Sequence, residues 1–197
     1  MNAAEFRVEE WMADGSRSAA IDAEIDLLAE VLHAVVHAGA GVSFFIPFSI
    51  DEARAFWVDK VLPQVRAGAR RVLVARDGER IAGTVQLELK MPPNQQHRAA
   101  VAKLLVHPAA RRRGIGRALM IALEDMARTE ERTLLTLDTV SGSSAESLYR
   151  SLDYIAVGII PRYARGALTS ELEGTTIMYK ELVPRSGQYA GVVVPPS

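Results

Sequence analysis

The residues best suited to chemistry in this chain form a basic, glycine-containing segment near its centre. An apolar run ends at Val106 before this segment, and helical spacing of apolar residues begins at Arg117 after it. Between them lie three consecutive arginines and two glycines: Arg111, Arg112, Arg113, Gly114 and Gly116. A helix start offers unpaired N–H groups and partial positive charge, and glycine lets a ligand approach the backbone. Because arginine adds forked donors, the segment predicts a site for a phosphorylated ligand such as a pyrophosphate.

Other interpretations of this segment fit less well. A dinucleotide-binding turn is one, because Asp138 lies 22 residues after Gly116, where a ribose-binding acid is expected. However, Leu119 occupies the third glycine position, and seven residues separate Val106 from Gly114. A Walker-type phosphate loop is excluded because no Gly-Lys-Ser/Thr follows. A solvated basic turn explains an arginine or two, but it does not explain the paired glycines.

The composition is that of an ordinary globular chain of 197 residues with a net charge of −1. There is no global basic field, so we expect neither nucleic acid nor a membrane as partner. The chain has no cysteine, which excludes disulfides, thiolate metal sites and a cysteine nucleophile. We also expect no metal. The acidic N-terminal residues do not resemble a signal peptide, and no apolar run reaches the ~20 residues of a membrane span. We therefore expect a cytoplasmic protein.

The elements that must position the basic segment follow from the hydrophobic periodicity. Turn residues and alternation predict strands over 5–11, 71–76, 80–90, 99–107, 134–140, 155–160 and 175–182. Helical spacing and caps predict helices over 20–38, 49–65, 117–128 and 143–152. Residues 71–107 form an antiparallel meander in this interpretation, and the fold class is mixed α+β. We expect one domain over 1–183 and a C-terminal tail over 184–197.

The pattern Arg111-x-x-Gly114-x-Gly116 resembles the acetyl-CoA motif of the GNAT superfamily of N-acetyltransferases. The order of the expected elements is similar to that superfamily across roughly residues 5–183. The resemblance implies a central, mostly antiparallel sheet that splits around acetyl-CoA and is flanked by about four helices. The segments KLLVHPAARRRGIGRALM, SLYRSLDY and GIIPRYA further resemble small bacterial enzymes grouped with the tabtoxin-resistance acetyltransferases.

The resemblance implies how acetyl-CoA is held. Backbone N–H groups from Arg112 to Arg117 would face the pyrophosphate, and the pantetheine arm would fill the split beside the preceding strand. A backbone N–H near Leu105 would polarise the thioester carbonyl, a contribution worth roughly 3–4 kcal/mol. Ser144 stands where the family often has asparagine. The cofactor-binding residues expected are Leu104, Leu105, Val106, Arg111, Arg112, Arg113, Gly114, Ile115, Gly116, Arg117 and Ser144.

The catalytic residues are also implied by the resemblance. Tyr149 falls at the position of the family's general acid, which protonates the leaving thiolate. Glu88 lies on the polar stripe of a meander strand, near where members often place a carboxylate base. Asp138 is a second candidate base, and a water relay to either carboxylate stays open. His107, directly before Pro108, is interpreted as a turn residue.

The acceptor pocket carries no motif. Five aromatic residues surround the first connector between helices, which borders the acceptor pocket in this superfamily: Phe44, Phe45, Phe48, Phe56 and Trp57. As a set they are expected in the core, with one or two touching the substrate. A loop over 161–165 is the candidate opposite wall, where Arg162 and Arg165 would favour an acceptor that bears a carboxylate.

Two functions follow from these expectations. The first is an acetyl-CoA-dependent N-acetyltransferase that modifies a primary amine of a small molecule. The amine would attack the thioester directly in a ternary complex, because a covalent acyl-cysteine route needs a cysteine. The alternative is a catalytically inactive CoA-binding regulatory or interaction module of the same fold. A monomer and a homodimer are both compatible with the sequence.

Overall fold

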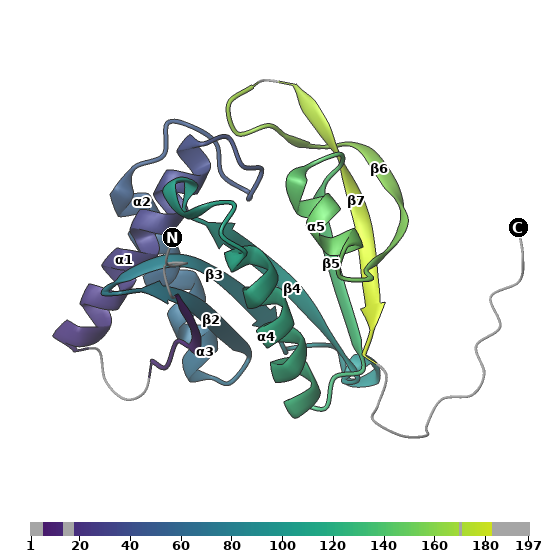
Figure 1. Ribbon diagram of the computed structural model, residues 1–197, viewed down its shortest axis with the longest axis horizontal. Coiled ribbons are helices and arrows are strands. Elements are labelled where there is room, and N and C mark those ends of the chain that lie inside the picture. Colours follow the sequence, from purple (N-terminus) through teal and green to yellow (C-terminus); the bar gives the residue numbers. More distant parts are fainter. Residues whose placement is uncertain (1–5, 14–17, 170, 183–197) are drawn as a thin grey trace, which may run out of the picture.

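A computed structural model describes residues 6–13, 18–169 and 171–182. The expected tail over 184–197 lies outside these residues. The chain forms one seven-stranded sheet in the order β1-β2-β3-β4-β5-β7-β6 (Figure 1). Its strands are β1 (Arg7–Glu10), β2 (Arg70–Asp77), β3 (Arg80–Glu88), β4 (Arg98–Val106), β5 (Leu134–Val140), β6 (Ile155–Arg165) and β7 (Leu172–Glu181). The expected mixed fold and the antiparallel β2-β3-β4 meander are confirmed.

Helices cover both faces of the sheet. They are α1 (Ala19–His37), α2 (Ile50–Ala55), the π-helical η1 (Phe56–Val61), α3 (Leu62–Arg66), α4 (Ile115–Thr129) and α5 (Ser144–Arg150). Short 3₁₀ turns η2 (Pro93–Gln95) and η3 (Pro108–Ala110) flank β4. Helix α4 packs on one face of β2, β3 and β4, whereas α1 packs on the other face of β3 and β4. No helix of the described part of the chain is long and apolar enough to cross a bilayer.

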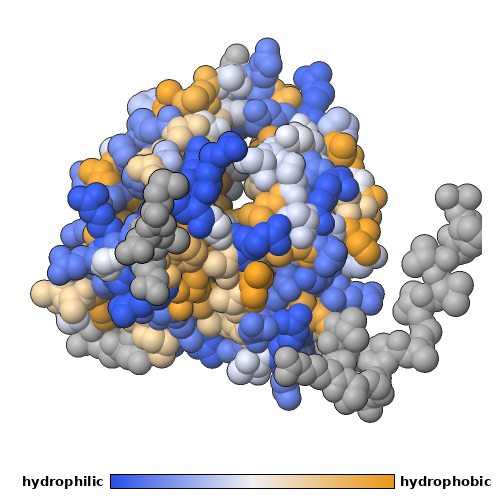
Figure 2. All heavy atoms as spheres, viewed as in Figure 1, coloured by the Kyte–Doolittle hydropathy of each residue, from blue (hydrophilic) through white to orange (hydrophobic). Residues whose placement is uncertain are grey.

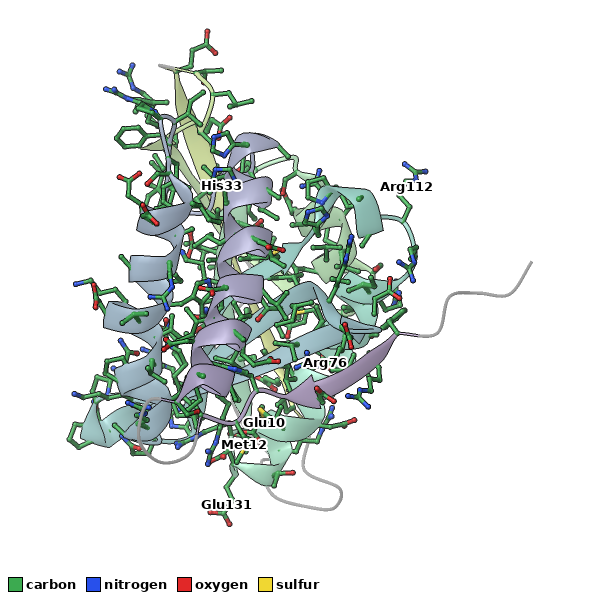
Figure 3. All side chains as sticks on the ribbon, turned by 90° about the vertical axis from the view of Figure 1, so that its left-hand side faces the viewer. Glu10, Met12, His33, Arg76, Arg112 and Glu131 are labelled. Carbon is green, nitrogen blue, oxygen red and sulfur yellow. The ribbon has the colours of Figure 1, made fainter. Side chains whose placement is uncertain are left out.

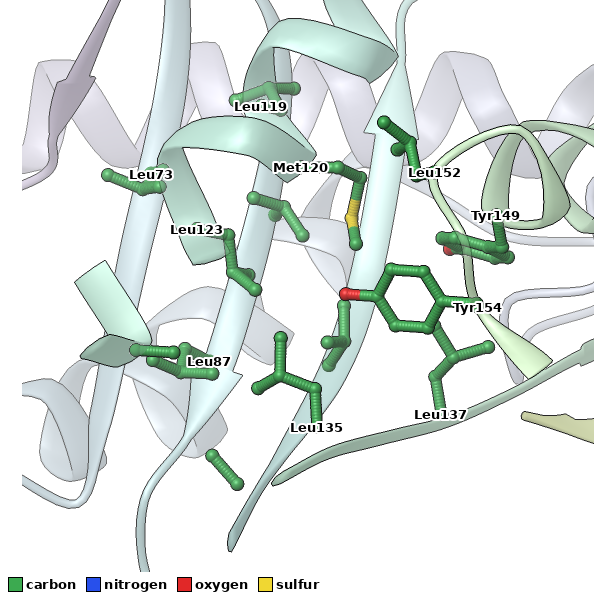
Figure 4. Close-up of a cluster of buried hydrophobic side chains, with 14 of the residues drawn as sticks. Leu73, Leu87, Leu119, Met120, Leu123, Leu135, Leu137, Tyr149, Leu152 and Tyr154 are labelled. Carbon is green, nitrogen blue, oxygen red and sulfur yellow. The ribbon is translucent and has the colours of Figure 1, made fainter. Parts of the chain in front are cut away.

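Each face of the sheet has its own hydrophobic core. On the α4 face, Leu119 and Leu123 pack against strand residues such as Leu87 and Leu135 (Figure 4). On the other face, Trp57 and the apolar stripe of α1 pack against β2 and the end of β4. The apolar periodicity of α1 and α4 predicts these two faces correctly, because helix residues three and four apart share one side.

The strands β4 and β5 form the one parallel pair of the described sheet, and they separate almost at once. Residues Arg98–Ala100 pair with Leu134–Thr136, and no further pairing joins the two strands. Beyond Ala100, β4 keeps β3 as its neighbour, while β5 pairs with β7 along its full length. The sheet is therefore split in the middle, as the resemblance implies, and backbone groups of both strands face the gap.

The second helix is one continuous helical segment, but its middle is π-helical. Ser49 caps its start and forms reciprocal hydrogen bonds with Glu52. The N–H of Leu62 then donates to the carbonyl of Trp57, five residues earlier. Pro63 has no N–H and its ring crowds the carbonyl four residues before it, so the widened turn lies directly before the proline.

Two expected boundaries near the C-terminal end are wrong. Residues 161–165 are not a loop, since β6 continues to Arg165 and pairs again with β7 at Ala164 and Arg165. An irregularity between Ile160 and Ala164, with Arg162 at φ +54°, interrupts the pairing. Similarly, β7 begins at Leu172 rather than at Thr175. Proline and arginine at 161 and 162 suggested a break, whereas a bulge absorbs them without ending the strand.

Candidate active site

The start of α4 presents unpaired backbone donors. Gly114 has φ +83°, a left-handed conformation that glycine adopts without strain, and it turns the chain into α4. The N–H groups of Gly114, Ile115 and Gly116 have no acceptor among the described residues. A Cβ on Gly116 would lie 3.1 Å from Leu148 Cδ2 of α5, so the first turn of α4 lies close to α5. This arrangement is an anion site built from main-chain groups.

The four arginines around this turn have different roles. Arg112, at φ +62°, extends away from the body of the protein (Figure 3). Arg111 Nε lies 3.4 Å from the carbonyl oxygen of Val106. Arg117 donates to Ser151 Oγ at 2.6 Å, which ties α4 to the end of α5. Arg111 and Arg112 thus remain the side chains best placed to add charge to a phosphate.

Arg113 is engaged with the β2–β3 turn. It forms an ion pair with Asp77, with 2.6 Å between Nη1 and Oδ2. The hydrogen bond from Arg113 lowers the pKa of the Asp77 carboxyl. The side chain of Arg113 therefore positions the loop against the sheet, although its backbone belongs to the same turn as the other expected phosphate donors.

A bulge interrupts β4 where it borders the gap. Thr84 of β3 pairs with Leu105, and Gln86 pairs with Ala102, so two residues of β4 oppose the single Val85. Lys103 has φ +51° at this point. Leu105 is fully buried, and its side chain packs with the α1 face of the sheet. The bulge thus leaves Lys103 and Leu104 without register partners on β3, and residues 103–106 also have no pairing with β5.

The surface is hollowed in the same region. Figure 2 shows a depression between the side of the molecule that carries α4 and the side that carries α5. We call this depression the cleft. The connector between α1 and α2 reaches across to the β6–β7 side, where the N–H of Ile46 lies 3.3 Å from the carbonyl oxygen of Ala167. The cleft therefore has a wall on each side of the split sheet and a connector at one end.

Tyr149 of α5 lies at the edge of the α4-side core, with its ring 5.7 Å from that of Tyr154 (Figure 4). Burial raises the pKa of the Tyr149 hydroxyl, and the nearby carboxylate of Asp138 raises it further. The hydroxyl forms no hydrogen bond to any described residue. At neutral pH it is therefore a protonated phenol with an unused donor.

The two carboxylates expected as bases have different hydrogen-bond partners. Glu88 Oε1 accepts a hydrogen bond from Arg70 Nη2 of β2, and Arg70 also donates to Gln86. Asp138 lies on the exposed side of β5 and accepts a hydrogen bond from Thr175 Oγ1 at 3.1 Å. Glu88 is thus held in an ion pair, whereas Asp138 accepts only a hydroxyl. Both carboxylates raise the pKa of Lys103 through their charge, so the two candidate bases lie in the same region of the molecule.

Lys103 and Arg70 are site residues that the sequence analysis misses. Lys103 Nζ donates to Ser43 Oγ at 3.1 Å and lies 5.8 Å from the ring centre of Phe44 and 5.9 Å from that of Phe56. The signal for Lys103 is present in the sequence, because it is the one charged residue in the apolar run 99–106. A half-buried cation inside such a run needs a partner or a function.

The five aromatic residues near the first connector differ in their burial. Phe48 and Trp57 are buried in the α1-side core, and Phe45 is 60% exposed. Phe44 and Phe56 are half-buried, and they are the two whose rings lie next to Lys103. Phe48 and Trp57 therefore lie in the core as expected, Phe44 and Phe56 pack partly against it, and contact with the substrate stays a prediction.

The remaining expected residues lie at the margins. His107 Nδ1 accepts the N–H of Ala109 in the turn after β4. Ser144 is the exposed first residue of α5, and Ser143 caps that helix through the N–H of Glu146. A full capping box would also need the Glu146 carboxylate to accept the N–H of Ser143. It accepts the N–H of Gly142 instead. Arg162 and Arg165 are exposed on β6 rather than on a loop.

Comparison with known proteins identifies the protein family that has this combination of features. Residues 40–154, which include the split strands, the start of α4 and Tyr149, match the acetyltransferase (GNAT) family. The chain belongs to the GNAT family of acetyltransferases. Among curated proteins, a mycothiol acetyltransferase from Mycobacteroides abscessus is 39% identical over 62 residues. That match covers 32% of this chain and 21% of the relative, so the chain spans about a fifth of that protein's length.

Solved structures show the same fold at low sequence identity. An N-acetyltransferase from Staphylococcus aureus Mu50 superposes with a TM-score of 0.71 at 14% identity, covering 91% of this chain and 99% of that one. A GNAT protein from Kribbella flavida gives 0.69 at 23% identity, with coverages of 89% and 97%. The acetyltransferase yncA from Salmonella typhimurium, solved with acetyl-CoA, gives 0.67 at 19% identity, with coverages of 93% and 99%. The GNAT fold therefore accounts for nearly all of the described chain.

Proposed function

We propose that this GNAT protein transfers the acetyl group of acetyl-CoA to a primary amine of a small molecule, by direct attack in a ternary complex. The observation that carries the proposal is the split between β4 and β5 beside a helix start with unpaired N–H groups. We further propose that residues 1–183 form a single catalytic domain around this split. The resemblance to the tabtoxin-resistance group stays a prediction.

The residues around the split fit acetyl-CoA. The N–H groups at Gly114, Ile115 and Gly116 would hold the pyrophosphate, with added charge from Arg111 and Arg112. Backbone groups of residues 104–106 face the gap and would pair with the amides of the pantetheine arm. When bound there, acetyl-CoA supplies an activated acetyl group as a thioester.

The chain's own residues then provide the remaining chemistry. The bulge at Lys103 and Leu104 frees backbone N–H groups that would polarise the thioester carbonyl. Glu88 or Asp138 would take the proton that the attacking amine loses as the C–N bond forms. Tyr149 would donate its proton to the sulfur as the C–S bond breaks. Burial of the phenol keeps this proton on Tyr149 until the sulfur becomes basic.

Two measurements test the proposal. Calorimetric titration of acetyl-CoA into the protein should show saturable binding, and a panel of amines should then release free thiol from acetyl-CoA. Binding without thiol release from any amine would favour the inactive CoA-binding module. The absence of saturable binding at millimolar acetyl-CoA would contradict both functions.

A further inference from the structure

Lys103 occupies its position because of the bulge in β4. Side chains of a regular strand alternate between faces, and Val101 lies on the α4 side. Regular alternation would send residue 103 to that side as well. The extra residue changes the phase, so Leu104 packs on the α4 side while Leu105 packs on the α1 side. Lys103 accordingly reaches residues of the α1-side connector and not the apolar core under α4.

The ammonium of Lys103 is only partly satisfied. It has three N–H donors, and one of them bonds to Ser43 Oγ. The rings of Phe44 and Phe56 lie on its flanks and offer cation–π contact without accepting a hydrogen bond. Within the described part of the chain, no carboxylate lies within ion-pair distance of Nζ. Two donors of this half-buried cation therefore have no partner among the described residues.

The charges around Lys103 do not neutralise it by contact. Arg70 adds a second positive charge, but its guanidinium is bound to Glu88 and Gln86. The carboxylates of Glu88 and Asp138 influence Lys103 from a distance without touching it. Burial lowers the pKa of the Lys103 ammonium, and the charge of Arg70 lowers it further. The position is thus a cation that is costly to bury and that a ligand anion would stabilise.

Two buried polar atoms of β3, next to the bulge, also lack a hydrogen-bond partner. Gln86 and Thr84 pair with the residues on either side of the bulge, and both side chains are fully buried. Gln86 Nε2 and Thr84 Oγ1 have no hydrogen-bond partner within the structure. Buried polar atoms without partners are uncommon and tend to mark functional positions.

We propose that Lys103 determines acceptor specificity by binding a carboxylate of the acceptor, so that the substrates are amines that also carry a carboxylate. The proposal rests on the acetyltransferase function above and names the substrate class for that same site. The apolar part of such an acceptor lies against Phe44 and Phe56, and its amine is directed toward the carboxylates at the cleft. Arg162 and Arg165, the cations suggested by the sequence, are not part of this anchor.

The test uses acceptor pairs in which a carboxamide replaces the carboxylate, with rates compared per unit of neutral amine because an α-carboxamide makes the neighbouring amine a weaker base. Suitable pairs are L-phenylalanine with L-phenylalaninamide, and para-(aminomethyl)benzoate with para-(aminomethyl)benzamide. Thiol release from acetyl-CoA gives kcat and KM for each member. We expect the wild-type protein to prefer the carboxylates by on the order of tenfold to a hundredfold in kcat/KM, the range for a charge-assisted hydrogen bond. Lys103→Met should bring the ratio close to one, mainly through KM.

Two control variants and the outcomes expected of two alternative roles separate this role from others. Lys103→Arg keeps the charge and should keep most of the preference. Lys90→Met removes an exposed lysine just after β3 and should leave the ratio unchanged. A general-base role for Lys103 would instead lower kcat for both members of each pair equally. A purely structural role, in which the aromatic rings are the only partners of the ammonium, would lower thermal stability and leave the ratio intact.

The outcomes also distinguish this inference from the proposed function. Acetyl-CoA binding with acetyl transfer, but with equal rates on acids and amides, overturns only the role of Lys103. If no pair is acetylated, calorimetric titration of benzoate into the CoA complex tests directly whether Lys103 binds a carboxylate. Equal binding by the wild-type protein and Lys103→Met, or no binding by either, overturns the inference. A lack of acetyl-CoA binding refutes the proposed function itself.

Discussion

The start of α4 and the part of β4 around Lys103 are built in different ways. At α4, main-chain N–H groups of a short contiguous stretch provide the donors, and glycines leave room for them. At β4, the polar groups are side chains from distant segments, with Ser43, Arg70, Glu88 and Lys103 coming from a connector and three strands. A site made of main-chain groups can therefore be predicted from the sequence, whereas a site made of side chains depends on which segments pack together.

The two regions should also respond differently to substitution. Changes at α4 should alter the use of acetyl-CoA for every acceptor. Changes on the β4 side should alter the choice of acceptor and leave acetyl-CoA binding intact.

The largest effect is expected at Tyr149, which lies between the two regions. Tyr149→Phe removes only the hydroxyl, which makes no hydrogen bond within the described structure, so the fold should persist. We expect kcat to fall by roughly 10²–10⁴-fold, the usual contribution of a general acid, with little change in KM for acetyl-CoA. Steady-state kinetics and a thermal melt on the same preparation check this. Tyr154→Phe, one ring away, is the matched control. An unchanged kcat for Tyr149→Phe would remove Tyr149 from the mechanism.

The second prediction concerns pH and the acceptor side. Lys103 is faced by Arg70 from β2, Glu88 from β3 and Asp138 from β5, and the net result is a lowered pKa. An ammonium is charged below its pKa and loses its charge as pH rises through that value. The preference for carboxylate acceptors should therefore disappear at a lower pH than an ordinary lysine would allow, a loss of about tenfold or more.

The check on this pH dependence is the acid-to-amide ratio of kcat/KM, measured between about pH 7 and pH 11. Lys103→Arg is the control, since a guanidinium stays charged across the range and should hold the ratio constant. If the ratio of the wild-type protein stays as flat as that of Lys103→Arg, another group supplies the charge.

The third prediction compares two neighbouring arginines of the α4 turn. Arg112 extends into solvent beside the unpaired donors, whereas Arg113 is paired with Asp77. Arg112→Ala should raise KM for acetyl-CoA by about fivefold with a smaller effect on kcat, because an exposed charge-assisted bond is worth about 1 kcal/mol. Arg113→Ala should change KM by less than about twofold. Equal effects on KM from the two substitutions would show that the turn acts only through its total charge.

The smallest effect is expected on stability at Gly114. Gly114→Ala places a Cβ at φ +83°, a strained conformation that costs about 1 kcal/mol. No neighbouring atom lies within 4 Å of that Cβ, so the cost comes from the backbone and not from a clash. We expect the melting temperature to fall by roughly 2–4 °C. Gly78→Ala, also at positive φ and open to solvent, is the control for strain outside the site. A drop in acetyl-CoA affinity at Gly114 but not at Gly78 would sharpen the comparison.

Particular elements show how far the sequence could be interpreted. The strand 134–140 has the expected bounds, because a continuous apolar run between a polar turn and Ser141 has few alternative structures. Ser49 and Ser143 both cap helices as their spacing predicts. In contrast, residues 161–165 continue a strand through a bulge, since pairing with β7 outweighs local turn preference. The same reason hides the bulge at Lys103, which only the register with β3 reveals.

What the sequence by itself determined is the turn with Gly114 and Gly116 ahead of a helix, its arginines, and a polar stripe that includes Glu88. These features are local, because glycine at positive φ and an uncapped helix turn need no distant partner to present their N–H groups. Only the tertiary structure decided which side of β4 carries Lys103, that Arg113 pairs with Asp77, and that Arg70 holds Glu88. Those contacts join residues far apart in the chain, and a shift of one residue in strand register would send each side chain to the opposite face.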